Sequence, residues 1–357
     1  MKPSADRKIK FFGCSLDCDE KYDSIQDKLH IMKTAEDFYD PLDGVMASLS
    51  IDIPTGLWDN TGTLSIPTWL GPKPLPGDRP KISTENFISF IDGNGCRKTA
   101  DAADRFVTER ILPHIPCLIG IDHSVTGGVF SALSRYYGCA DISLIIIDSH
   151  TDAIPMSALS GAVQYDAETN PSSVHDLNDP FLYNRPDSYN AATFVHSLIA
   201  EKQVDPENLY FIGVSDYPEI KSLRIKDARI KKYTQSFVRL KDLGAKIITK
   251  KDCKLNPGKI KGFLSKISTP YVYVSVDMDI GAGNALEGVR FRNWKGLDES
   301  QIYKIAGMVR QVLSGSIRLA GMDICEIDPR RAGLTYPSGT DQTYKIAANL
   351  IKKIAFN

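Results

Sequence analysis

The stretch Ile142-Ser143-Leu144-Ile145-Ile146-Ile147-Asp148-Ser149-His150-Thr151-Asp152 decides the fold, because a run of β-branched apolar residues ends directly in three ionisable side chains. The apolar part predicts a strand at Ile142–Asp148 that is buried on both faces, as strands of parallel sheets are. Six similar runs predict further strands. They are Ile9–Ser15, Cys117–Asp122, Leu209–Val214, Ala245–Thr249, Tyr271–Asp277 and Leu319–Ile327.

Segments with helical periodicity lie between these strands. The predicted helices are Gly127–Tyr137, Ala191–Lys202, Thr234–Leu243, Glu299–Leu313 and Gln342–Ala355. Alternating strands and helices predict an α/β fold with three layers, α/β/α, and a mainly parallel sheet. We expect a single domain over residues 1–357, with insertions of loops and short elements near 40–90 and 157–190, where Pro, Gly, Asp, Ser and Asn are frequent and periodicity is weak.

The composition limits the classes of function. Basic and acidic residues number 43 and 44, so the chain lacks the basic field typical of proteins that bind nucleic acid or membrane surfaces. No apolar run approaches the ~18 residues of a membrane span, and no signal peptide is visible. Seven scattered cysteines form no disulfide framework, and Cys14 and Cys18 have no second close pair to complete a zinc knuckle. We expect a cytoplasmic protein with a small-molecule substrate.

Ligand-type residues gather at the predicted strand ends. They are His123, Asp148, His150, Asp152, Asp277, Asp279 and Glu326. An extended backbone would point Asp148, His150 and Asp152 to one side, since they alternate at every second position. Carboxylates that face one another in a cleft repel unless cations neutralise them. Carboxylate and imidazole suit Mn, Fe, Ni or Zn, and the excess of oxygen favours manganese. We therefore expect two divalent cations.

Simpler interpretations exist for single residues. A histidine at a strand end, such as His123, can be an ordinary buried or surface side chain. An aspartate there often caps the next helix, which could explain Asp122, Asp279 or Asp328. The triple Asp148, His150 and Asp152 is harder to explain this way, and the second pair of aspartates strengthens the metal prediction.

These motifs resemble those of the ureohydrolase family, which includes arginase, agmatinase and formimidoylglutamase. The matching segments are Gly120–Ser124, Asp148–Asp152, Ser275–Asp279 and Glu326–Pro329, within a resemblance that runs from about Asp101 to the C-terminus. The resemblance implies an arginase-like fold, two Mn²⁺ (with Ni, Fe or Zn as alternatives) and a homo-oligomer, trimeric or hexameric.

The resemblance also implies roles for residues. His123, Asp148, Asp152 and Asp277 would ligate one cation, and Asp148, His150, Asp277 and Asp279 the other. A hydroxide between the metals would attack the carbon of a linear amidine or guanidino compound, and urea or a related product would leave. Glu326 and Asp152 would be catalytic residues, with Glu326 pairing with the cationic group of the substrate. Asp216 matches a substrate-side acid.

The sequence departs from the family pattern at several positions. Ile121 replaces a glycine, and the segment after Asp279 lacks the family's final Asp and Pro. The family's loop histidine, a proton shuttle, aligns with Gln164 or Asn190, depending on which neighbouring segment guides the alignment. His175 in the insertion could serve instead. Two alternatives therefore stay open, namely hydrolysis of a formimino or other amide C–N bond, and a metal-binding scaffold without catalysis.

Overall fold

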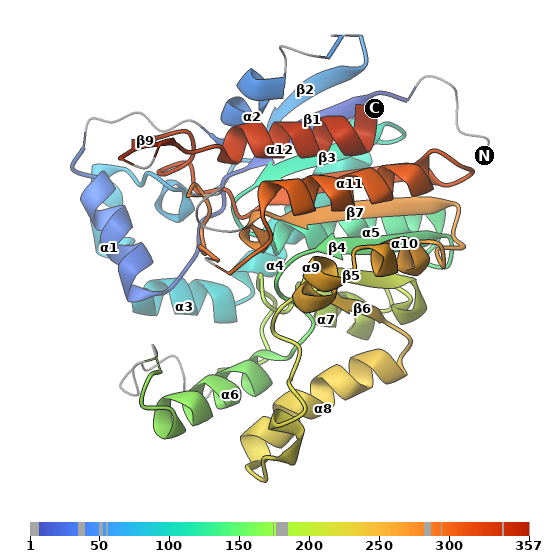
Figure 1. The fold of residues 1–357 in the computed structure, drawn as a ribbon. Helices are drawn as coiled ribbons and strands as arrows, with labels where there is room; N and C mark the ends of the chain where they lie inside the picture. Colours follow the sequence, from blue (N-terminus) through green and yellow to red (C-terminus); the bar gives the residue numbers. More distant parts are fainter. Residues whose placement is uncertain are drawn as a thin grey trace.

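The computed structural model describes residues 7–34, 40–49, 53–54, 56–173, 175, 185–281, 287–293, 295–337 and 339–356. Eight parallel strands form the central sheet (Figure 1). In spatial order they are β2 (Trp58–Thr63), β1 (Ile9–Cys14), β3 (Ile115–Gly120), β8 (Arg318–Cys325), β7 (Tyr271–Asp277), β4 (Ile142–Ile147), β5 (Leu209–Val214) and β6 (Lys246–Thr249). Near the C-terminus, β9 (Thr335–Tyr336) and β10 (Gly339–Thr340) form a short antiparallel pair.

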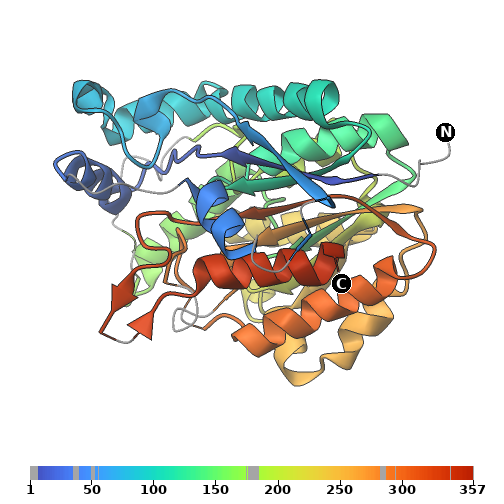
Figure 2. The same cartoon turned by 90° about the horizontal axis from the view of Figure 1, so that it is seen from above.

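Helices cover both faces of the sheet, which gives the predicted three layers (Figure 2). One face carries α3 (Thr84–Asp92), α4 (Gly95–Phe106), α5 (Val125–Tyr137) and α7 (Phe194–Ala200). The other carries α2 (Pro41–Leu49), α9 (Lys250–Leu255), α10 (Gly258–Leu264), α11 (Glu299–Leu313) and α12 (Thr343–Ile351). Helix α1 (Tyr22–Ile31) follows β1. The prediction of an α/β/α fold with a parallel sheet is confirmed.

Alternating side chains supply the two cores on the two faces. In β1, Phe11 packs into the core that lies under α2, α11 and α12, whereas Phe12 packs into the core under α4 and α5. Both side chains are fully buried. The same period of two explains why the strands read as continuous apolar runs, because both of their faces are covered.

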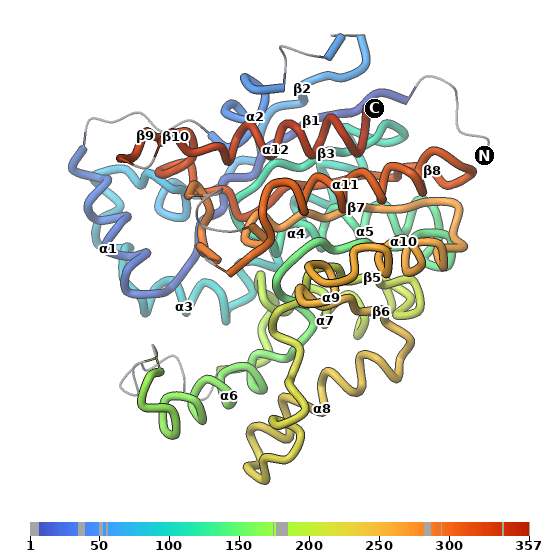
Figure 3. The backbone as a smooth tube through the Cα atoms, in the orientation of Figure 1, coloured from blue at the N-terminus to red at the C-terminus, as the bar shows by residue number. Residues whose placement is uncertain are grey.

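One segment differs from the sequence prediction. Residues 157–190 were expected to be loops and short elements, but they begin within α6 (Met156–Thr169), a helix of 14 residues. This helix pairs with α8 (Ala228–Asp242), and both extend away from the sheet (Figure 3). Ala158 and Phe237 fill their contact. The insertion near 40–90 contributes the edge strand β2, which pairs with β1 alone and whose polar residues are buried on neither face.

Shorter helical turns complete the connections. The 3₁₀ turns are Thr68–Leu70, Pro76–Lys81, Pro206–Asn208, Ser222–Arg224 and Met278–Ile280, and π-helical turns follow α4 at Val107–Ile111 and α12 at Lys352–Phe356. Within the described ranges, no helix is both long and apolar enough to cross a lipid bilayer.

Candidate metal centre

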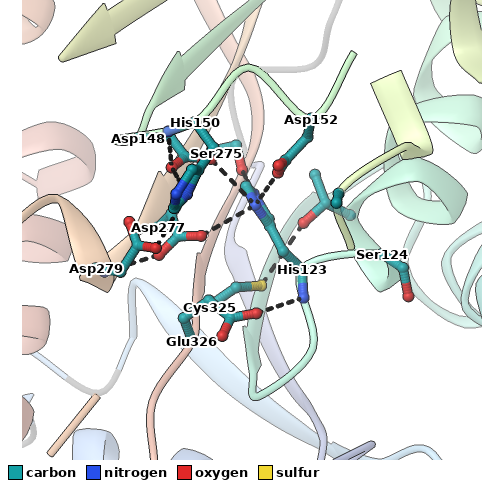
Figure 4. A network of polar contacts seen from close by, with 12 residues as sticks. His123, Ser124, Asp148, His150, Asp152, Ser275, Asp277, Asp279, Cys325 and Glu326 are labelled. Carbon is teal, nitrogen blue, oxygen red and sulfur yellow. Dashed lines mark hydrogen bonds and ion pairs between the residues drawn. The ribbon is translucent and has the colours of Figure 1, made fainter. Parts of the chain in front are cut away.

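The candidate ligands lie at the carboxyl ends of four neighbouring strands, at one edge of the sheet. Strands β3, β8, β7 and β4 are adjacent, and their carboxyl ends lead into His123, Glu326, Asp277 and Asp148. Parallel strands place their carboxyl ends at the same edge, where ligand sites of open α/β sheets form. Figure 4 shows the four aspartates gathered around the His123 and His150 rings.

One group of potential ligands surrounds His123. Its Nδ1 atom lies 2.9 Å from Asp152 Oδ2, 3.3 Å from Asp277 Oδ2 and 3.5 Å from Asp148 Oδ2. All four side chains are buried. Their ligand atoms lie within 4.8 Å of one another, which is compatible with one metal ion.

A second group shares Asp148 with the first. His150 Nδ1 lies 3.2 Å from Asp279 Oδ2 and 3.5 Å from Asp148 Oδ1. Asp279 is buried, whereas the His150 side chain is 50% exposed and faces the pocket. The six residues predicted as metal ligands therefore come together as two adjacent groups, with Asp148 at their junction.

The backbone geometry behind this convergence differs from the prediction. The expected extended continuation of the strand through Asp152 was wrong, because β4 ends at Ile147 and Asp152 has a φ of +50°. Asp277 likewise ends β7 and caps a 3₁₀ turn by accepting the backbone N–H of Asp279 at 2.7 Å. Tight turns, not alternation along a strand, aim these side chains at one point.

Backbone strain also marks the site. Four non-glycine residues in the described ranges have positive φ values, and two of them, Asp152 and Glu326 (φ +63°), lie in this centre. Left-handed backbone costs an ordinary residue about 1–3 kcal/mol, and such strain clusters at functional sites, where surrounding contacts enforce it.

A buried chain of hydrogen bonds orients His123 from behind. Its Nε2 atom lies 2.8 Å from Ser275 Oγ, and Ser275 donates to Asp323 Oδ1 at 2.8 Å. Tyr273 donates to the other oxygen of Asp323 at 2.6 Å. This arrangement leaves Nδ1 directed at the aspartates. The role of Ser275 and Asp323 was not predicted from the sequence, although both lie on buried strands that end at the site.

The electrostatics of the centre fit bound cations. Burial, together with neighbouring acids, raises the pKa of both Asp148 and Asp277. The pKa of His123 is also raised: burial opposes this, but Asp152 and Asp277 prevail. His123 Nδ1 and Asp148 Oδ2 are buried without a hydrogen-bond partner. Buried polar atoms rarely stay unpartnered in proteins, and a cation between these ligands would satisfy both.

Five of the six predicted ligands, all except Asp148, line a pocket of about 380 Å³. Asp216 and Asn190 line its wall, as does the predicted catalytic Glu326. Burial raises the pKa of Asp216 to about 7, and its Oδ1 atom has no hydrogen-bond partner. Ile154, Leu159 and Phe291 add apolar surface to its lining.

Two predicted residues lie away from this pocket. Gln164 sits on α6 and accepts a hydrogen bond of 3.5 Å from Arg229 at the start of α8, so its side chain faces the neighbouring helix. His175 is exposed, and its backbone N–H donates to Ser173 Oγ at 3.2 Å. Neither is among the described residues that line the pocket. Residues 174 and 176–184 of this insertion lie outside the described ranges.

Arg290 was not predicted as a site residue from the sequence. Its side chain is 5% exposed and lines the pocket, with Nη1 3.0 Å from Asp122 Oδ2 and 3.5 Å from Glu326 Oε1. Its backbone N–H donates to Glu326 O at 3.0 Å, which fixes the loop against the end of β8. Glu326 keeps one buried oxygen, Oε2, without a partner. No local pattern could reveal this pairing between residues 36 positions apart.

The family profile described as Arginase family matches residues 82–356. The chain belongs to the arginase family. An arginase from Staphylococcus aureus (strain MRSA252) is 25% identical over 260 residues, which cover 70% of this chain and 74% of that protein. An arginase from strain COL is 25% identical over 215 residues, and the match spans 60% of each chain. The predicted family membership is confirmed, and the low identity marks a divergent member.

Solved structures share the arginase-family fold. Arginase from Bacillus subtilis is 17% identical, with a TM-score of 0.58, and the alignment covers 98% of this chain and 99% of that one. Proclavaminate amidino hydrolase from Streptomyces clavuligerus is 15% identical, with a TM-score of 0.58 and coverage of 98% and 90%. Formimidoylglutamase from Bacillus subtilis has 15% identity, a TM-score of 0.57 and coverage of 99% and 87%. At such identities these likenesses show the fold of this arginase-family chain.

Proposed function

We propose that this protein is a metal-dependent hydrolase of a C–N bond in a linear amidine or guanidino compound. The observation that carries the proposal is the convergence of six carboxylate and imidazole side chains, five of which line a pocket that Glu326 also lines. Membership of the arginase family supports it. A structural cluster of acids would not need an adjoining cavity with further polar groups.

The donor set suits two divalent cations. His123, Asp148, Asp152 and Asp277 would hold one, and Asp148, His150 and Asp279 the other. Asp277, which the family resemblance implies as a second bridging ligand, belongs to the first group in the structure. The predominance of carboxylate oxygen favours manganese. Cations held there would supply an activated water molecule near neutral pH for attack on the amidine carbon.

Glu326 is the residue we assign to the cationic end of the substrate. Its Oε1 atom accepts the His123 backbone N–H at 3.2 Å, whereas the buried Oε2 atom has no partner. A carboxylate with one free oxygen can accept a charge-assisted hydrogen bond from an amidinium nitrogen. Asp216 and Asn190, on the pocket wall, are the proposed contacts for the rest of the substrate.

A formimino compound is the second candidate substrate. Arg290 Nη1 lies 3.5 Å from Glu326 Oε1, so the carboxylate already has a positive neighbour inside the protein. Because of this neighbour, Glu326 should favour the binding of a strongly basic guanidinium over a less basic formimino group by a smaller margin. It also supplies a donor for an acidic substituent of the substrate.

An activity screen tests both candidates. The manganese-loaded protein is incubated with guanidino acids, agmatine-like amines, guanidine and formimino compounds, and the release of urea, ammonia or formamide is measured. We expect one class to be hydrolysed and Glu326→Gln to lower kcat/KM about 100-fold or more without loss of metal, because one placed electrostatic contact contributes about that much to catalysis. Glu109→Gln, at an exposed residue, is the control. Bound metal without hydrolysis of any compound would favour a non-catalytic scaffold instead.

We also propose a homo-oligomeric assembly, a trimer or a hexamer, on the strength of the family resemblance. Light scattering after size-exclusion chromatography measures it directly. A mass near the 39.5 kDa of one chain would reject this part of the proposal.

A further inference from the structure

A second cluster of ligand-type side chains lies beside the metal centre. Cys18 comes from the loop after β1, Cys96 from the first turn of α4, and Asp122 from the loop after β3. The Cys18 and Cys96 sulfurs are 3.5 Å apart, and Cys18 donates to Asp122 Oδ2 at 3.2 Å. All three side chains are buried, and their ligand atoms lie within 4.8 Å of one another.

These separations fit a tetrahedral cation site. With metal–sulfur bonds of about 2.3 Å and metal–oxygen bonds of about 2.0 Å, two sulfurs lie about 3.8 Å apart and a sulfur and an oxygen about 3.5 Å apart. The observed distances are within a few tenths of an ångström of these values. A disulfide, with sulfurs about 2.05 Å apart, would require the two thiols to approach by roughly 1.5 Å.

Cationic and anionic side chains both surround the site, and Lys28 and Arg330 also lie 2.7 and 3.4 Å from Asp17. Arg290 donates to Asp122 at 3.0 Å, but Asp17 and Glu326 lie 3.6 and 3.5 Å from the same guanidinium. Binding a divalent cation releases a proton from each thiol, so the local net charge stays the same. Cys18 and Asp122 both line the pocket, which gives an ion a route to the site.

We propose that Cys18, Cys96 and Asp122 form a separate site for one thiophilic divalent cation of the zinc, cobalt and cadmium class. The site is distinct from the carboxylate–imidazole centre, because thiolates select softer ions than manganese. It adjoins the pocket through Asp122, which an ion would share with Arg290.

Cobalt binding tests the site in the intact, manganese-loaded protein. Co²⁺ bound to thiolate gives a near-ultraviolet charge-transfer absorption that Co²⁺ bound to carboxylate and imidazole lacks. We expect this band to saturate at one equivalent of cobalt in the wild-type protein and to be absent in both Cys18→Ser and Cys96→Ser. Cys139→Ser, which removes the exposed cysteine, is the control and should keep the band.

X-ray absorption at the zinc edge provides an independent measurement on the unaltered chain. Two sulfur ligands per zinc ion would support the proposal even if a serine variant failed to fold. A wild-type protein with all thiols reduced and no charge-transfer band would overturn it, and so would a band that survives in both variants. Neither measurement depends on hydrolysis, so failure of the proposed enzymatic function would leave this result unaffected.

Discussion

Asp148 has a central position at the scale of single residues. Its Oδ1 atom accepts the backbone N–H of His150 at 2.7 Å, and its Oδ2 atom, 3.5 Å from His123 Nδ1, has no hydrogen-bond partner. The two oxygens therefore face the two halves of the centre. A carboxylate in this position is suited to bridging two cations.

Replacing Asp148 by alanine should abolish tight metal binding. The change removes the shared ligand, so the affinity should fall by more than the ~10–100-fold typical of losing a residue that only supports a ligand. Elemental analysis of the purified protein measures the retained metal. Asp242→Ala, at the exposed end of α8, should keep full metal content. Full occupancy in Asp148→Ala would refute the ligand assignment.

Ser275 allows a subtler test, since it positions His123 without reaching the metals. Ser275→Ala removes the 2.8 Å contact with His123 Nε2, so metal affinity should fall about 10–100-fold. The control is Ser143→Ala, which removes another buried serine, on β4, that contacts Thr269 at 2.8 Å away from the centre. Isothermal titration calorimetry measures the metal affinity of both variants. Equal affinities would show that the chain through Asp323 plays no part in binding.

The six ligand positions could be predicted because each follows an apolar run, so the strand and its polar end are visible together in the sequence. Arg290 and Cys96 could not. Arg290 gains its role from Glu326 and Asp122, and Cys96 from a thiol 78 positions earlier. Only the fold brings these partners together, and no local period encodes them.

At the scale of elements, the close packing of α5 against α4 beside the site makes these helices sensitive to larger side chains at their contact. Gly128 in α5 faces α4 so closely that an added Cβ would lie 1.9 Å from Ala100 O. Backbone atoms cannot yield as a flexible side chain can, so a methyl group there would push the two helices apart. Because α5 begins just after His123, this packing also holds the loop that carries a ligand.

Two glycine-to-alanine changes in helices should therefore have opposite effects. Gly128→Ala should destabilise the fold by about 1–3 kcal/mol or more through overpacking. Gly307→Ala, in α11, has open space for the new methyl group and should stabilise by about 0.5–1 kcal/mol through helix propensity. Thermal unfolding of the metal-loaded proteins measures both. If both substitutions shifted the unfolding temperature in the same direction, the contact between Gly128 and the α4 backbone would not explain their effects.

The elements that the sequence predicted well are the buried strands and the amphipathic helices. Tyr271–Asp277 and Glu299–Leu313 match their observed bounds, since each has a strong period and, in the helix, a capping box between Asp298 and Gln301. Strand β2 and helix α6 were missed for physical reasons. The edge strand is polar, and α6 buries little besides Ala158 and Ser160, so neither shows the apolar pattern of a central element.

At the scale of the whole molecule, the two hydrophobic cores offset the free-energy cost of burying the acidic side chains of the metal centre. Burial, and then the neighbouring aspartates, raise the pKa values of Asp148 and Asp277. A carboxyl whose folded pKa is raised binds its proton more tightly in the folded state, so metal-free stability falls as the pH rises above its unfolded pKa of about 4. The raised pKa of His123 acts in the same direction, because its contribution is lost as the pH rises above about 6.5.

Metal removal should therefore destabilise the protein most at high pH. Cations that bind only the folded state add about 2.7 kcal/mol per site at 100 times their dissociation constant. They also remove the repulsion that grows as the acids ionise. We expect the unfolding temperature of the chelated protein to fall between about pH 5 and pH 8, and the increase in unfolding temperature on adding manganese to widen over the same interval.

Two variants serve as controls for this prediction. Asp148→Ala should show little increase at either pH, whereas Asp242→Ala should follow the wild type. A manganese effect that is independent of pH, or that persists in Asp148→Ala, would mean that the ion binds elsewhere and that the buried acids are balanced by protons alone.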